Sequence, residues 1–441
     1  MIPYIRFAHA ILFAVVSLVP LLVAPAHAAG SIGIGDLLDL EFGYDTLTTQ
    51  YYRHTSAQQI ADGARTGITA YLISRGIADP LVPPIRPVRN DALKGIERAV
   101  ASVLLRYGKR VETRALVYAA LSGEVAAVRD PYTTFFTPSQ YRAFNRYLDA
   151  PRFAGIGAVL SEDPTVKEPR IDDVVPNSPA ERAGIVPGDL IARIDGKPTQ
   201  GLDVDTIAKL LRGPAGTRVT IEIVRNGNPR PPIVLKRALI DPPTVYARML
   251  PNAIAYLKLT VFGGTTGDEL RRAIQRVDRQ GARAYILDLR DNGGGYEQSA
   301  VKVAEAFIAT GPILTIEERG GHRTVVSADG KALARKPLVV LVNGNTASAS
   351  EIVAGAIQDD RLGTIVGERT YGKGLVQSVF PLPDGAALKV TTGRYFTARG
   401  RDVDKVGIEP DVVVAEPRGS QYGDPRRDPQ LARAIELLTP S

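Results

Sequence analysis

"PLVVLVNGNTASASEIVAGAIQDD", residues 337–360, is the stretch of sequence that determines the fold. Its first part is a nearly continuous apolar run, typical of a buried strand with helices on its faces. A short turn of small and polar residues follows, and apolar residues then recur at helical spacing. This order of strand, turn and helix predicts an α/β domain. Two serines, Ser348 and Ser350, stand where the helix begins.

The composition excludes several classes of protein. The 441 residues are enough for two or three domains, and the chain has no cysteine, so disulfides, thiolate catalysis and cysteine-based zinc sites are excluded. The net charge of +7 comes from scattered basic residues. That scatter favours an ordinary solvated surface over a nucleic-acid partner. Histidine occurs four times, at His9, His27, His54 and His322.

The first 28 residues have the pattern of a secretory signal. Arg6 precedes an apolar segment at 11–24, and small residues at Ala26 and Ala28 suit a cleavage site. The apolar segment is short for a membrane-spanning helix, so we expect cleavage after Ala28. An uncleaved membrane anchor is the alternative. Both readings predict an exported protein that is periplasmic or otherwise extracytoplasmic.

Four regions follow the signal along the chain. Residues 29–150 show helical periodicity, interrupted by the proline-rich segment 79–91. Residues 151–233 hold short β-rich runs punctuated by glycine and proline, with one clear helix. Strands and helices alternate over residues 234–416, which predicts the α/β domain. Residues 417–441 are polar and charged, and we expect a peripheral tail.

Ser348 has two interpretations. Ser348 and Glu351 fit a capping box, in which the serine accepts a helix N–H and the glutamate reaches back to the serine N–H. A serine at a strand-to-helix turn is also typical of a catalytic nucleophile, because backbone N–H groups there are available to bind an oxyanion. The fragment alone leaves both interpretations open.

A nucleophilic serine needs a base to take its proton. His54 and His322 lack a nearby orienting carboxylate in the sequence and are expected on the surface. Lys373 lies between two glycines in "GERTYGKGLVQ", residues 367–377, so its backbone can pass close to another segment. A lysine acts as a base near neutral pH where burial lowers its pKa. Gln377 can then orient it, and a solvated turn lysine is the alternative.

The later motifs resemble those of the carboxy-terminal processing proteases, also called tail-specific proteases, which are PDZ-containing Ser-Lys serine peptidases. The resemblance covers nearly the whole chain after the signal and is strongest over residues 153–414. The motifs occur in the family's order: "GIGAVL", "SPAERAGIVPGDLI", "YLKLTVF", "LDLRDNGGG", "NTASASEIVAGAIQD", "GERTYGKGLVQ", "LPDGAALKVTTGRYFT" and "VGIEPDVVV".

The resemblance implies a multi-domain α/β protein with a helical N-terminal region, a PDZ-like β domain and a crotonase-like Ser-Lys protease core. It assigns the nucleophile to Ser348, the base to Lys373, the orienting amide to Gln377, and the oxyanion hole to the backbone N–H groups of Gly294 and Ala349. The interval of 373 − 348 = 25 residues is the family's usual spacing. Asp359 matches an acid expected to be structural, and Ser350 becomes a packing residue.

The resemblance also describes how substrates are recognised. PDZ modules take up an extended peptide by strand addition and hold its carboxylate in backbone N–H groups. Gly155, Ile156 and Gly157 match the loop that makes this contact. The implied partners are protein or peptide substrates with apolar C-termini, and an adaptor or activator protein and a homo-oligomer stay open. No metal or other cofactor is expected.

Two departures and two alternatives accompany this assignment. Tyr132 stands where many relatives carry histidine, and Gly293 where proline is common; neither replaces a catalytic group. One alternative function is a catalytically inert PDZ scaffold that only binds peptides. The joint presence of Ser348, Lys373 and Gln377 argues against it. The other is an acyl-CoA-processing enzyme, which the crotonase-like core suggests and the PDZ insertion disfavours.

Overall fold

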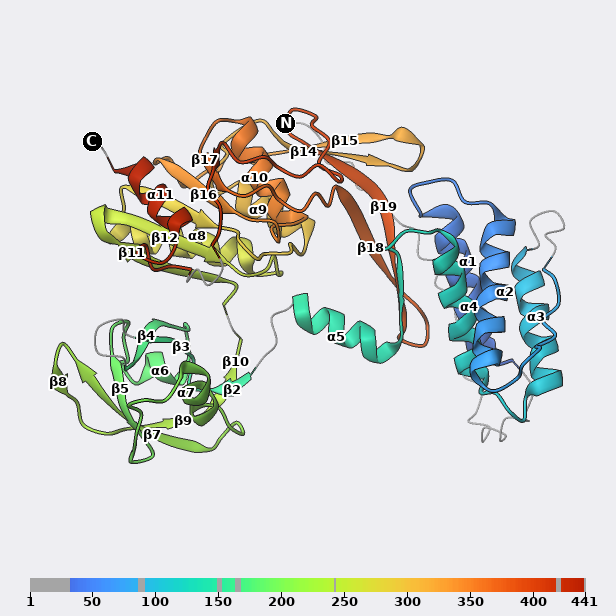
Figure 1. Cartoon of the computed structure of the whole chain (residues 1–441), viewed down its shortest axis with the longest axis horizontal. Coiled ribbons are helices and arrows are strands. Elements are labelled where there is room, and N and C mark those ends of the chain that lie inside the picture. The colour runs from blue at the N-terminus through green and yellow to red at the C-terminus, as the bar shows by residue number, and fades with distance from the viewer. Residues whose placement is uncertain are drawn as a thin grey trace, which may run out of the picture.

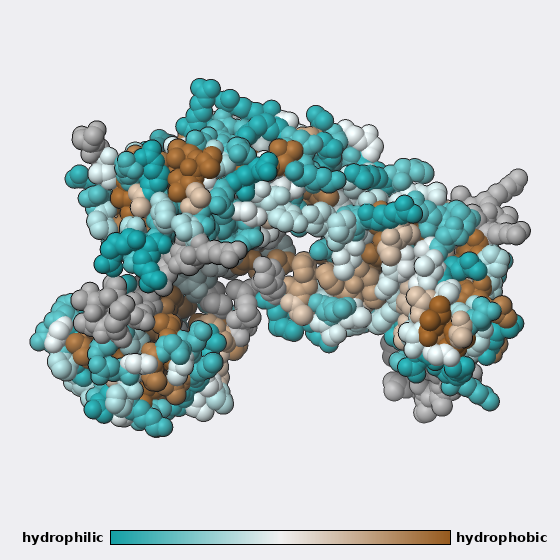
Figure 2. All heavy atoms as spheres, viewed as in Figure 1, coloured by the Kyte–Doolittle hydropathy of each residue, from teal (hydrophilic) through white to brown (hydrophobic). Residues whose placement is uncertain are grey.

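The computed structural model describes residues 32–85, 92–148, 153–162, 168–241, 243–417 and 422–439. These form a helical bundle, a small β domain and an α/β core, which confirms the predicted fold class (Figure 1). Hydrophilic residues cover most of the face seen in Figure 2. The predicted signal at 1–28 lies outside the described residues. Within them, no helix combines the length and apolar character needed to cross a membrane.

A six-stranded sheet forms the centre of the α/β core, in the order β11-β12-β13-β16-β17-β20. All neighbours are parallel except β11, which runs antiparallel to β12. The strands are β11 (Val245–Leu250), β12 (Ile254–Leu259), β13 (Ala284–Asp288), β16 (Leu338–Val342), β17 (Thr364–Gly367) and β20 (Val412–Val413). Every residue of β16 is buried, as its uninterrupted apolar sequence predicts.

Helices cover both faces of this sheet. α8 (Thr266–Arg279), α9 (Glu297–Ala304) and α10 (Ala349–Asp359) share one apolar core with alternate residues of β12, β13 and β16. The residues in between, on the opposite face, pack against α11 (Pro429–Leu438). Short 3-10 turns lie at Pro251–Ala253 and Arg319–Gly321. The predicted strand, turn and helix of residues 337–360 are therefore β16 and α10 at the centre of the domain.

The expectation of a peripheral C-terminal tail is wrong for residues 429–438. Leu431 and Ala434 of α11 are fully buried against the sheet. The buried guanidinium of Arg290 also binds two carboxylates, Asp288 at 2.6 Å and Asp428, just before α11, at 2.7 Å. A buried charge is tolerated where it is paired in this way. The sequence analysis missed this helix, which covers one face of the sheet, because the segment contains many charged residues.

A second sheet connects the core to the helical bundle. Its order is β1-β19-β14-β15, with β18 paired to β19. The strands are β1 (Thr134–Phe136), β14 (Pro312–Glu318), β15 (Arg323–Ser327), β18 (Leu375–Pro381) and β19 (Ala387–Thr397). The β18–β19 hairpin extends from the core to the bundle (Figure 1), where Leu382, Leu388 and Val390 enter the bundle's apolar core. The bundle helices are α1 (Ile34–Thr49), α2 (Ala57–Ser74), α3 (Ala92–Tyr107) and α4 (Thr113–Ala127).

The β domain has its own apolar core. Its strands are β3 (Ala158–Glu162), β4 (Pro169–Val174), β5 (Leu190–Ile194), β6 (Lys197–Pro198), β7 (Arg218–Arg225), β8 (Asn228–Pro229) and β9 (Ile233–Lys236), with helices α6 (Pro179–Arg182) and α7 (Val204–Leu211). The expected end at residue 233 is the first residue of β9, which pairs with β7, so the sheet continues to Lys236. β2 (Phe153–Gly155) and β10 (Ala238–Ile240) pair where the chain enters and leaves the domain. α5 (Pro138–Leu148) precedes it.

Candidate active site

One cavity of about 730 Å³ is lined by all five residues that the sequence assigns to the reaction. Ser348 and Ala349 come from the start of α10, and Gly294 from the loop after β13. Lys373 and Gln377 come from the beginning of the β18–β19 hairpin and the residues just before it. Residues of α5 form another wall. Gly155, Ile156 and Gly157 of the β domain do not line this cavity.

Ser348 lies at the sharp turn between β16 and α10. Its backbone has φ 57° and ψ −117°, a conformation that non-glycine residues rarely adopt. Such strained strand-to-helix turns present a nucleophilic side chain to a substrate. The Glu351 half of the predicted capping box forms, because the Ser348 N–H donates to Glu351 Oε2 at 2.8 Å. Ser350 is fully buried and its hydroxyl donates to the Asn292 carbonyl at 2.9 Å, as expected for a packing residue.

The Glu351 carboxylate does more than cap the helix. It is fully buried, and it also accepts hydrogen bonds from the Thr370 hydroxyl at 2.5 Å, the Gly372 N–H at 2.7 Å and the Lys373 N–H at 2.9 Å. One side chain therefore fixes the backbone of Ser348 relative to that of Lys373. The sequence predicted the contact within the helix and missed those to residues 370–373, because nothing in a capping pattern indicates a partner about 20 positions away.

Lys373 is held in an environment that disfavours its charged form. Burial lowers the pKa of Lys373 below its usual value and the positive charge of Lys389 lowers it further, while Glu351 and Asp130 act in the opposite direction. Its Nζ lies 5.1 Å from the centre of the Tyr132 ring. Across the described part of the chain, the ammonium group makes no hydrogen bond or ion pair. A lysine in this environment is suited to act as a base.

Gln377 lines the cavity without contacting Lys373 through a hydrogen bond in the described structure. Its Nε2 is buried and has no hydrogen-bond partner among the described residues. A buried amide without a partner is costly, and it is available to a ligand that enters the cavity. The expected orienting contact with Lys373 is thus not formed here, although both side chains face the same space.

Gly294 lies directly against Ser348. Its φ is +98°, and a Cβ at this position would come within 2.9 Å of the Ser348 Cβ and of the Ala349 nitrogen. The Gly294 N–H donates to Asn292 Oδ1 at 3.0 Å, so an oxyanion would share or replace that acceptor. Ala349 is the first residue of α10, where an N–H has no acceptor within the helix.

This geometry predicts that an alanine at Gly294 lowers peptidase activity and that an alanine at the neighbouring Gly293 does not. Gly294→Ala introduces a Cβ into a space that the start of α10 already fills, and we expect peptidase activity to fall by about 100-fold or more, as misplaced catalytic groups commonly cause. Gly293→Ala is the matched control, because a Cβ there meets nothing within 4 Å. Turnover of a protein substrate measures both. Equal activities of the two variants would contradict this account of Gly294.

The predicted peptide-binding loop lies at one edge of the β domain. β3 is the terminal strand of its sheet, and α7 contacts it, which leaves an open edge beside a helix. The Ile156 side chain is buried in the domain core, and Gly155 and Gly157 beside it are buried as well. In the described structure, the N–H groups of Ile156 and Gly157 donate no hydrogen bond. Backbone N–H groups in this arrangement are suited to holding a carboxylate.

His54 and His322, in contrast, are exposed and lie outside the Ser348 cavity, as predicted. Tyr395 and Lys389 are among the cavity residues that the sequence analysis did not single out. Tyr395 is buried and donates from its hydroxyl to the Ser348 carbonyl at 3.2 Å, and Lys389 faces the cavity from β19. Both lie within a pattern that predicts only a strand, so the sequence offers no signal for a role beside Ser348.

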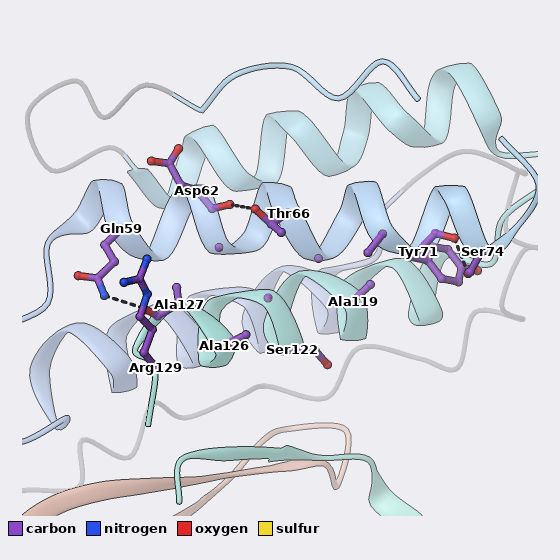
Figure 3. Close-up of a pocket in the computed structure, with 14 residues that line it drawn as sticks. Gln59, Asp62, Thr66, Tyr71, Ser74, Ala119, Ser122, Ala126, Ala127 and Arg129 are labelled. Atoms are coloured by element: carbon purple, nitrogen blue, oxygen red, sulfur yellow. Dashed lines mark hydrogen bonds between the residues drawn. The ribbon is translucent and has the colours of Figure 1, made fainter. Parts of the chain in front are cut away.

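A second cavity, of about 810 Å³, lies between α2 and α4 in the helical bundle (Figure 3). Small residues such as Gly63, Gly67 and Gly123 line it, and one of its polar side chains, Gln59, donates from Nε2 to the Ala127 carbonyl at 2.6 Å. It contains none of the residues assigned to the reaction. The Ser348 cavity is therefore the candidate active site.

Known proteins match the chain over both the core and the β domain. Residues 253–414 match peptidase family S41, and residues 170–225 match a PDZ domain. A carboxyl-terminal-processing protease of Synechocystis is 38% identical over 342 residues, covering 76% of this chain and 80% of that protein. The carboxy-terminal processing protease CtpA of Bacillus subtilis is 37% identical over 325 residues, covering 73% and 69%. The solved photosystem II D1 C-terminal processing protease is 30% identical, covering 87% and 94%, with a TM-score of 0.48.

The α/β core with its cavity-facing serine is joined to a PDZ domain. This combination, together with the matched family, places the chain in the class of serine peptidases. The chain belongs to the carboxyl-terminal processing proteases of peptidase family S41. The predicted resemblance, the serine peptidase activity and the processing of C-termini are thereby confirmed. The comparisons give no support to an inert peptide-binding scaffold.

Proposed function

We propose that Ser348 and Lys373 form the catalytic dyad of this peptidase. The observation that carries the proposal is the Glu351 carboxylate, which binds the backbone of both residues at one end of a single cavity. Unprotonated Lys373 takes the Ser348 hydroxyl proton as the serine oxygen attacks a substrate carbonyl. The lowered pKa of Lys373 favours the amine form that this step requires.

The remaining steps use the same groups. The Ala349 N–H, together with the Gly294 N–H once it turns from Asn292, stabilises the tetrahedral oxyanion. Protonated Lys373 then gives its proton to the leaving amine, and water hydrolyses the acyl-enzyme with Lys373 again as base. Gln377 completes the site by offering its amide, which has no partner in the described structure, to Lys373 or to the substrate.

Three variants test the dyad. Ser348→Ala is expected to lose activity by at least about 10⁴-fold, as removal of a nucleophile does in other serine peptidases. Lys373→Arg is expected to be equally inactive, because arginine keeps the charge but does not release its proton. Ser327→Ala is the control, since Ser327 is exposed on β15 and does not line the cavity. In the parent enzyme, kcat/KM should rise with pH as Lys373 loses its proton, reaching its plateau at lower pH than an ordinary lysine would allow. Activity retained by Ser348→Ala would refute the assignment.

We also propose that the PDZ domain binds the apolar C-terminal tails of substrates at the edge of β3. Support comes from the unpaired N–H groups of Ile156 and Gly157 and from the open strand edge beside α7. The domain then either delivers tails to the cavity or regulates it. An adaptor or activator protein and self-association remain predictions from the family resemblance.

A pair of peptides tests this binding mode. Full-length Ser348→Ala protein should bind an apolar-tailed peptide with a free C-terminal carboxylate at least about tenfold more tightly than its C-terminal amide, because charge-assisted hydrogen bonds to N–H groups are lost in the amide. Calorimetric titration measures both affinities. Equal affinities would remove the carboxylate from the recognition mechanism.

The site of action is a further proposal from the sequence. The pattern of residues 1–28 supports export to the periplasm or another extracytoplasmic space. After expression with its own N-terminus, the mature chain is expected to begin at Ala29, which mass spectrometry of the N-terminal peptide determines. Recovery of the uncleaved chain in the membrane fraction would indicate an anchor, and recovery in the cytoplasm would refute export.

A further inference from the structure

A second lysine faces the active-site cavity. Lys389 lies on β19, where it pairs with Thr134 of β1 on one side and Val379 of β18 on the other. It is partly buried, and it lines the same cavity as Ser348 and Lys373. The reaction proposed above does not use it.

Aromatic rings hold the Lys389 ammonium group. Its Nζ lies 5.7 Å from the centre of the Phe136 ring and 5.6 Å from that of Phe144 on α5. The described residues provide it with no hydrogen bond or ion pair. Aromatic faces favour the charged form of a lysine, so this arrangement stabilises an ammonium ion without neutralising it. A cation without a counter-ion extends its field into the cavity.

The carboxylate that acts on Lys389 is already committed elsewhere. Burial lowers the pKa of Lys389 below its usual value, and the Asp130 carboxylate acts in the opposite direction. The Asp130 oxygens accept hydrogen bonds from the Tyr132 N–H at 3.0 Å and from the hydroxyls of Thr133 at 2.7 Å and Thr391 at 2.5 Å. These contacts anchor the carboxylate in the loop between α4 and β1, so it does not form an ion pair with the lysine.

That loop and β1 bring the two lysines together. Tyr132 lies beside the Lys373 ammonium group, and Phe136, four residues on, lies beside that of Lys389. Two like charges in one partly buried cavity disfavour each other's charged form. Lys389 has two aromatic contacts and Lys373 has one, which favours the charged form on Lys389. The other titratable groups around the pair, among the described residues, are Asp130, Tyr132, Tyr141, Tyr296, Glu297, Lys302, Glu351 and Tyr395.

We propose that Lys389 is a positioning residue for the peptidase reaction: its ammonium charge, held between Phe136 and Phe144, keeps Lys373 as the free amine that accepts the Ser348 proton. The inference rests on the proposed Ser348–Lys373 dyad and adds a second cation to it. A neighbouring cation is an established means of activating a lysine in enzymes. Lys389 acts through Lys373 and touches no reacting atom.

The test compares kcat/KM for a protein substrate, from pH 6 to 10.5, in the parent enzyme, Lys389→Met and Lys389→Arg. Lys389→Met removes the charge, so the acid limb of the profile is expected to move to higher pH. Activity at neutral pH should fall about three- to tenfold and return to the parent value on the alkaline plateau, since one pKa unit corresponds to a factor of ten. Lys389→Arg keeps the charge and should retain the parent profile. Lys389→Gln serves as a second neutral variant if Lys389→Met fails to fold, and circular dichroism monitors folding.

Two results would overturn the inference. One is an acid limb that stays in place in both neutral variants. The other is a loss of activity that is independent of pH and appears in KM, which would make Lys389 a contact for the substrate. Failure of the dyad itself is seen separately, as cleavage that persists in Lys373→Arg or an absence of cleavage by the parent enzyme at any pH.

Discussion

The proposed active site depends on one buried carboxylate, that of Glu351. It accepts hydrogen bonds from two segments of the chain, the start of α10 and residues 370–373. Buried polar oxygens are stable only when hydrogen-bond donors surround them, so the two segments must meet for this side chain to be buried at low cost. The Glu351 side chain therefore couples formation of the fold to the alignment of Ser348 with Lys373. The Tyr371 N–H also donates to the Thr346 carbonyl at 3.0 Å, which joins the same two segments directly through their backbones.

The parallel sheet supplies the second constraint. β13 and β16 are neighbours, and the loops that follow them leave the sheet at the same edge. The loops are bound to each other, since the Asn292 carbonyl accepts both the Ala347 N–H at 3.1 Å and the Ser350 hydroxyl at 2.9 Å. Gly294 is thereby placed against the Ser348 turn without any direct bond between them. The glycine run of one loop and the serine turn of the other form a single structural unit.

Much of this arrangement was predictable from local sequence, and the features missed at Arg290 and Lys389 share one cause. The strand, turn and helix at residues 337–360 and the gathering of five named residues in one cavity followed from short motifs and their family order. The ion pair of Arg290 with Asp428 joins residues 138 positions apart, and the charged segment around it has no pattern that indicates burial. In the sequence, Lys389 likewise has only the pattern of an ordinary strand residue. Its surroundings are formed by β1 and α5, which contribute Phe136 and Phe144. Contacts between distant segments, absent from any motif, decide these features.

The β18–β19 hairpin has a further consequence for the architecture of the enzyme. One end of β18 lines the candidate active-site cavity with Gln377, and the tip beyond its other end inserts Leu382 into the interior of the helical bundle. The bundle is therefore not a detachable appendage: without it, Leu382, Leu388 and Val390 would face water on a long unsupported ribbon. The part of the chain that folds as one unit is therefore larger than the segment that carries the peptidase motifs, because it includes the helical bundle. The β18–β19 hairpin connects the bundle to the candidate active-site cavity. An insertion or deletion that moves the bundle is therefore expected to move residues that line this cavity as well.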